Sequence, residues 1–123
     1  MITAHKGLVD VIAYDSLACG SPFINACDSL DVDAVIRVKN NHNLAIRRVK
    51  KLTNKKKPIK YWNDGEYKIE AYESIFYMDG VKAPLRFLKF AKEKRSGKRS
   101  QVMIVTTAID MRIKTVYKIM KAR

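Results

Sequence analysis

The sequence contains no apolar run that approaches the roughly 20 residues a membrane-spanning helix needs. Its N-terminus lacks the basic-then-apolar pattern of a secretory signal, so we expect a cytoplasmic protein that does not enter a membrane. Cysteine is scarce, and the spacing of Cys19 and Cys27 matches no metal or redox motif, which predicts free thiols. His5 and His42 have no second ligand-type residue at metal-site spacing, which argues against zinc.

Acidic residues are also in short supply. The 123 residues include 25 Lys and Arg against 12 Asp and Glu, a formal net charge of +13. Residues 1–36 hold five acids and one base, whereas residues 37–60 hold ten bases and no acid. Residues 86–99 hold seven bases and one acid, and residues 112–123 hold five bases and no acid. Because such runs repel themselves, they indicate an anionic partner, nucleic acid first and acidic lipid second.

The N-terminal third predicts a βαβ unit. Residues 8–14 are almost continuously apolar and rich in β-branched side chains, which is typical of a buried strand. Ser21 and Pro22 are typical of a helix start, and Phe23, Cys27 and Leu30 would form one apolar face of a helix over 22–30. A second strand is predicted over 34–39. The short links favour parallel strands with a right-handed crossover.

The remainder reads as a helix, a linker, a meander and a final helix. A basic helix is predicted over 44–52, with Ala45, Val49 and Leu52 on its apolar face, and a flexible basic linker over 53–66. Period-two alternation over 67–77 and 85–91 predicts two strands, and Asp79-Gly80 is a hairpin signal. Residues 102–108 are apolar on both faces, which predicts a third, central strand, and the three strands together suggest an antiparallel meander. Helical spacing returns over 111–123, without a C-terminal capping residue.

Asp15 follows the first predicted strand and is the first candidate functional residue. Ligands and metals gather at the carboxyl edge of strands in α/β folds. An aspartate at this position is also common as the cap of a turn or a helix. The residues alone leave both interpretations open.

An ordered set of segments resembles a known family. The segments are Ala13-Tyr14-Asp15-Ser16-Leu17, Ser21-Pro22-Phe23-Ile24, the strand AVIRVK over 34–39, the strand VMIVTT over 102–107 and the helical stretch over 116–123. Together they resemble the DDE-type transposases of bacterial insertion sequences. The resemblance implies an α/β fold: a partial RNase H-like core (βαβ plus helices) with an inserted antiparallel β meander.

The resemblance also implies a division of the chain and a set of roles. Residues 1–52 would be part of the catalytic core, 53–66 a basic linker, 67–108 the inserted β subdomain and 109–123 the start of a C-terminal core helix. Asp15 would be the second catalytic carboxylate and a ligand of a two-Mg²⁺ site, and Arg123 the family's arginine. Met120 stands where the family has a tyrosine. The other two carboxylates would lie outside this sequence, so we expect an internal fragment that does not itself catalyse DNA cleavage and strand transfer.

The basic runs are candidate contacts to double-stranded DNA. We expect phosphate contacts, which give affinity without sequence choice, from ten bases: Arg37, Lys39, Arg47, Arg48, Lys50, Lys51, Lys94, Arg95, Lys98 and Arg99. Tyr61 and Trp62 would either stack on an exposed base or, as is commoner, pin the linker to the core.

Two other functions fit the same residues. The first is a small basic nucleic-acid-binding module without catalytic activity, which would need no carboxylate at a strand edge. The second is a protein that joins a transposase subunit and interferes with assembly. A partial core would leave a sheet edge unpaired, which also predicts self-association through that edge.

Overall fold

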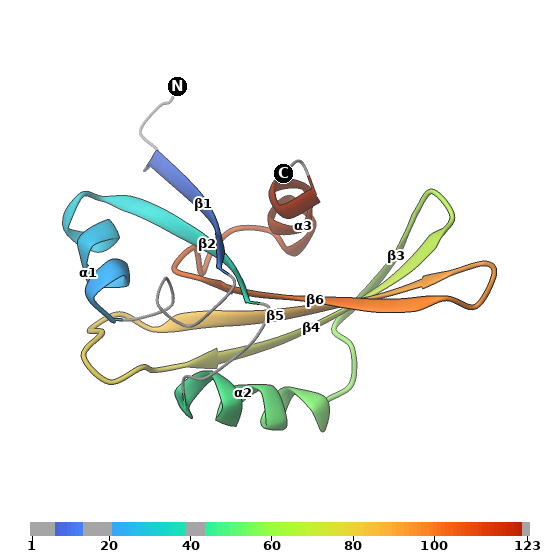
Figure 1. The fold of residues 1–123 in the computed structure, drawn as a ribbon, viewed down its shortest axis with the longest axis horizontal. Coiled ribbons are helices and arrows are strands. Elements are labelled where there is room, and N and C mark those ends of the chain that lie inside the picture. Colours follow the sequence, from blue (N-terminus) through green and yellow to red (C-terminus); the bar gives the residue numbers. More distant parts are fainter. Residues whose placement is uncertain (1–6, 14–20, 39–43, 122–123) are drawn as a thin grey trace.

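The computed structural model describes residues 7–13, 21–38 and 44–121. They form an α/β fold built on a six-stranded sheet with the strand order β1-β2-β6-β5-β4-β3 (Figure 1). The elements, in chain order, are β1 (Gly7–Ala13), α1 (Ser21–Ser29), β2 (Val32–Val38), α2 (Leu44–Asn54), β3 (Lys60–Asp64), β4 (Tyr67–Phe76), β5 (Leu85–Lys94), β6 (Arg99–Thr106) and α3 (Ile113–Lys121). Within the described residues, no helix has the length and apolarity needed to span a membrane.

The predicted βαβ arrangement is confirmed. β1 and β2 are parallel, with Ala13 opposite Val38 at their carboxyl ends, and α1 connects them in sequence. Ile24 and Cys27 of α1 are buried, and Cys27 is a free thiol. Leu30, which was predicted to share the apolar face, is 74% exposed because α1 ends at Ser29 and the chain turns away.

The strands of the predicted meander continue the same sheet. β4, β5 and β6 are antiparallel neighbours, as predicted. β6 also pairs antiparallel with β2, so that Val35 lies opposite Thr106. Five of the six strands therefore form an antiparallel array, and β1 adds the parallel pair at one end.

Apolar side chains cover both faces of this sheet. On one face, Ile24 of α1 and Val49 of α2 pack with Ile36, Phe87 and Val105 of the strands. On the other, residues of α3 pack with strand residues of the alternate register; the buried members of this second cluster include Val35, Leu88, Phe90, Ile104, Val116 and Met120. Figure 1 shows α2 and α3 on opposite sides of the strands. The sheet is thus the middle layer of three.

The buried face of α2 differs from the predicted one. Ile46, Val49 and Thr53 face the sheet, whereas Leu52 is 60% exposed. Thr53 satisfies its hydroxyl in this buried position, because Oγ1 donates to the carbonyl of Val49 at 2.7 Å and lies 2.7 Å from Oγ of Ser74. A polar residue therefore occupies the interface that a leucine was expected to fill, and a serine on β4 makes this possible.

The segment predicted as a flexible linker is largely ordered. Thr53 and Asn54 complete α2, and β3 pairs antiparallel with β4 through a two-residue turn. Gly65 takes φ of 60° at the first position of that turn, which glycine adopts without strain. Trp62 packs edge-on against Phe90 and Tyr117, with ring centroids 6.1 and 5.4 Å apart. The tryptophan therefore holds β3 to the α3 side of the core.

Candidate nucleic-acid interface

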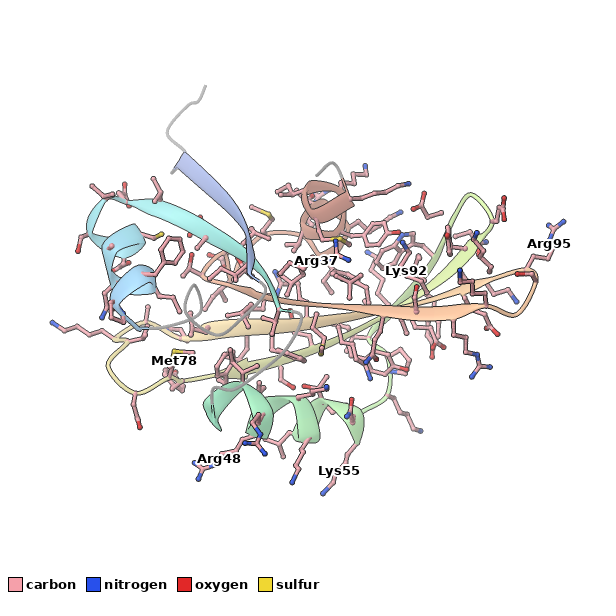
Figure 2. The ribbon with its side chains drawn as sticks, in the orientation of Figure 1. Arg37, Arg48, Lys55, Met78, Lys92 and Arg95 are labelled. Carbon is pink, nitrogen blue, oxygen red and sulfur yellow. The ribbon has the colours of Figure 1, made fainter. Side chains whose placement is uncertain are left out.

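The outer side of α2 and the turn after it form a continuous run of bases. Because Ile46, Val49 and Thr53 face the sheet, the basic residues that lie between and after them point away from it. We call this surface the α2 basic face; its members are Arg47, Arg48, Lys50, Lys51, Lys55, Lys56 and Lys57, all exposed except the half-buried Lys50. Figure 2 shows Arg48 and Lys55 extending away from the sheet.

No carboxylate among the described residues forms an ion pair with the α2 basic face. Residues 34–63 include no Asp or Glu. The ion pairs between described residues join Arg86 to Glu73, Arg99 to Glu93 and Lys121 to Asp64, so none involves this face. Lys56 donates to a neutral acceptor, the carbonyl of Glu73, at 3.2 Å. A surface with several unpaired cations attracts polyanions and loses affinity for them as salt rises.

Lys89, on β5, contacts the C-terminal end of α2 from the sheet. Its Nζ donates to Oδ1 of Asn54 at 3.0 Å and lies 4.3 Å from the centre of the Tyr72 ring. Burial lowers the pKa of Lys89, and the charge of Lys50 lowers it further, whereas Glu70 opposes both effects. This lysine therefore anchors the helix and is not part of the exposed cationic surface.

A second basic group occupies the turn between β5 and β6. The turn closes with a hydrogen bond from Gly97 N to the Lys94 carbonyl at 2.8 Å, and Gly97 has φ of 94°. Arg99 pairs with Glu93 at 3.2 Å, and Nζ of Lys94 lies 5.4 Å from the centre of the Tyr67 ring. Arg95 and Lys98 are exposed, and Figure 2 shows Arg95 at the far tip of the hairpin. This tip therefore offers fewer free cations than its sequence suggests.

The basic run over 86–99 also contains a structural arginine. Arg86 is 5% exposed and pairs with Glu73 across the β4–β5 ladder. Its Nη1 also donates to the carbonyls of Ala108 and Met111, in the segment that precedes α3. The guanidinium thus ties two strands to the connection before the helix. Nothing in the local sequence distinguishes this buried base from the more exposed bases of the same run.

The structure separates one predicted DNA contact from the others. Arg37 is half-buried and alternates with Ile36, so it lies on the α3 side of the sheet, opposite the α2 basic face (Figure 2). A single straight track of phosphates along α2 therefore does not include Arg37. Lys39, Asp15 and Arg123 lie outside the described residues.

The predicted magnesium site receives no support from the described part of the chain. There, no three His, Cys, Asp or Glu side chains come together in a way that could hold a metal ion. β1 ends at Ala13, two positions before Asp15, and its parallel partner β2 ends opposite it. Of the predicted site, the described residues therefore include only the sheet edge at which β1 and β2 end.

A groove of about 520 Å³ was not anticipated from the sequence. It lies over the ends of β3, β4, β5 and β6 that project beyond α2, and its lining includes Tyr61, Asn63, Glu70, Glu93 and Arg99. Its charges are of both signs, which distinguishes it from the α2 basic face. The alternation of Tyr61, Trp62 and Asn63 could have indicated the strand that forms one wall of this groove, but these residues lie in the stretch interpreted as a linker.

Comparison with known proteins adds no further constraint. No protein-family model matches this chain, and no curated protein or solved structure is detectably similar to it.

Proposed function

We propose that this chain binds double-stranded DNA through the α2 basic face, as part of a DDE-type transposase core. The observation that carries the DNA-binding proposal is the exposure of Arg47, Arg48 and Lys51 without a carboxylate partner among the described residues. Lys55, Lys56 and Lys57 extend the same surface. Cations on a rigid helix meet phosphates at fixed spacing, which gives affinity that is independent of base sequence.

The tip of the β5–β6 hairpin is a secondary contact in this proposal. Arg95 and Lys98 are exposed there, but Arg99 is engaged by Glu93. We therefore assign most of the electrostatic free energy of binding to α2.

The transposase part of the proposal rests on the order of the elements and on Asp15. The parallel pair β1–β2, the intervening α1, the antiparallel strands and the return to a helix follow the order that the resemblance implies. Asp15 would supply one oxygen ligand for Mg²⁺, and in that family two such ions activate the nucleophile and stabilise the leaving oxygen. The alternative is a basic nucleic-acid-binding module without catalysis, which shares the α2 basic face but gives Asp15 no role.

The DNA-binding proposal is tested by a salt titration with a charge-matched control. We compare the triple variant Arg47→Gln/Arg48→Gln/Lys51→Gln with Lys68→Gln/Lys82→Gln/Lys118→Gln, which removes three exposed charges elsewhere. Fluorescence anisotropy with a labelled duplex gives the binding constant at several salt concentrations. We expect the slope of log K against log salt to fall by about 2–3 in the α2 variant, since each phosphate contact contributes about 0.9. Equal slopes in the two variants, or no binding by the parent chain at low salt, would overturn the proposal.

A further inference from the structure

β3 is the last strand of the described sheet at the end opposite β1, and no described strand pairs with its outer edge. Figure 1 shows the β3–β4 hairpin projecting beyond the helices. Lys60, Tyr61 and Asn63 are exposed, and Tyr61 keeps 64% of its surface accessible. An edge of this kind presents backbone N–H and C=O groups to another strand.

The register with β4 shows which backbone groups of β3 point away from β4. Asp64 and Tyr67 flank the two-residue turn, so they form a hydrogen-bonded pair. Hydrogen-bonded and non-hydrogen-bonded pairs alternate along an antiparallel ladder. Tyr61 and Asn63 therefore belong to non-hydrogen-bonded pairs with β4, and their N–H and C=O groups point to the outer edge.

We propose that a second copy of this chain pairs with this edge, with the two β3 strands antiparallel about a two-fold axis at Trp62. Tyr61 of one copy then lies opposite Asn63 of the other, and the free backbone groups of both residues form hydrogen bonds. The same register places Lys60 opposite Asp64 of the second copy. A parallel arrangement would put like charges side by side, and it would not close as a two-fold pair.

Charge complementarity selects this occupant. The strand Lys60–Asp64 has a base at its first position and an acid at its last, both on the α3 side of the sheet. Asp64 already accepts hydrogen bonds from Lys121 and Tyr117, and a carboxylate has lone pairs for about four partners. A second lysine can therefore join it without displacing either. The self-complementary end charges favour a copy of β3 over an unrelated peptide.

The pairing has a consequence for the groove. Tyr61 and Asn63 line it in each copy. Because these two residues meet across the two-fold axis, the grooves of the two copies become one continuous groove. Association also has a distinctive salt dependence: each chain has a net charge of +13, and salt screens the repulsion between copies. Dimerisation should strengthen with salt, whereas DNA binding weakens, so the two proposals fail independently.

Sedimentation velocity on the full chain tests the proposal. We expect a dimer at concentrations of roughly 100 µM, with a Kd that falls as salt rises from about 0.05 to 0.5 M. Asn63→Pro removes an outward N–H while leaving the bonds to β4, and should give a monomer. The matched control Asn63→Ala keeps the N–H and should remain dimeric. Lys60→Glu should weaken association by at least about tenfold, because it places two acids opposite each other.

A disulfide experiment checks the register independently of whether the proline variant folds. In a Cys19→Ser background, Tyr61→Cys and Asn63→Cys are oxidised separately and as a mixture. The proposed register predicts a cross-linked dimer in the mixture and little from either variant alone, since only position 61 faces position 63 of the second copy. A parent chain that is monomeric throughout the titration, a proline variant that folds by circular dichroism and still dimerises, or cross-linking without this register would overturn the proposal.

Discussion

The hydroxyl of Tyr117 donates a hydrogen bond of 2.8 Å to Oδ2 of Asp64, which joins α3 to the last residue of β3. Lys121, one helical turn further on, donates to the same carboxylate at 2.7 and 2.8 Å. Burial raises the pKa of Tyr117, and its bond to Asp64 raises it further. The tyrosine therefore remains a donor throughout the physiological pH range, and the contact holds the edge strand to the core.

The stabilising effect of Asp64 should depend on pH. The hydrogen bond from Lys121 lowers the pKa of Asp64 most, followed by that from Tyr117. Because the folded pKa lies below the unfolded value of about 3.9, the stabilisation is present above that value and is lost as pH falls through the folded pKa. We expect Asp64→Asn to lower the free energy of unfolding by about 1 kcal/mol at pH 7. Urea unfolding of both proteins at pH 7, 5 and 2.5 checks this; a difference that does not shrink in acid contradicts it.

Replacement of Arg86 should be among the costliest single changes. Arg86→Met leaves Glu73 without its partner and two carbonyls without their donor, and we expect a loss of about 3 kcal/mol. Arg86→Lys keeps the charge but not the guanidinium geometry, so its free energy of unfolding should lie between those of the parent and Arg86→Met. Denaturant midpoints measure the series. The exposed Arg48→Met serves as control and should change stability by less than about 0.5 kcal/mol. Equal losses for the two methionine variants would show that Arg86 has no special role.

The hydroxyls of Thr53 and Ser74 should be energetically coupled. Thr53→Val preserves shape but leaves the buried Ser74 hydroxyl without this partner, and we expect a loss of about 1–3 kcal/mol. Thr53→Val/Ser74→Ala removes both groups and should recover part of that loss. A double-mutant cycle from thermal or urea unfolding gives the coupling energy. Strict additivity of the two single changes would mean that the hydrogen bond contributes nothing.

Manganese binding separates the transposase proposal from the simple binding module. If Asp15 is a metal ligand, Mn²⁺ should broaden the amide resonances of Ala13 and Val38, the paired residues at the ends of β1 and β2. Asp15→Asn should abolish the broadening, whereas Asp79→Asn, an exposed acid in the β4–β5 turn, should leave it intact. Retained broadening in Asp15→Asn would remove the reason for placing a metal at this residue.

Local sequence patterns predicted most of the elements but not their phase or their neighbours. The alternation in β4 and β5 and the helix start at Ser21 were readable, because they depend on nearby residues. In α2, Leu52 looked like a core residue and Thr53 did not. In the structure Thr53 is buried and Leu52 is exposed. The buried threonine has a hydrogen-bond partner in Ser74, which lies on β4 and could not be placed from the local sequence.

β3 was missed because its stabilising contacts are distant in sequence. Three consecutive lysines and Pro58 precede it, and this composition is typical of a linker. What orders the strand is the packing of Trp62 on Phe90 and Tyr117, together with the bonds from α3 to Asp64. The same reason explains what was missed in the candidate site. The bases of α2 were predicted as a group, but Arg37 lies on the opposite face of the sheet, and that separation depends on the pairing of β2 with the distant strand β6.

The pairing of β2 with β6 also constrains how the chain folds. Val35 and Thr106 are neighbours in the sheet although 71 positions separate them in the sequence. A ribosome adds roughly 5–20 residues per second, so β2 waits roughly 4–14 s for its antiparallel partner. The N-terminal βαβ unit therefore cannot complete its part of the sheet as it emerges, and folding of the described sheet depends on the later synthesis of β6. Such long-range closure favours slow folding, with the edge of β2 open to wrong partners in the meantime.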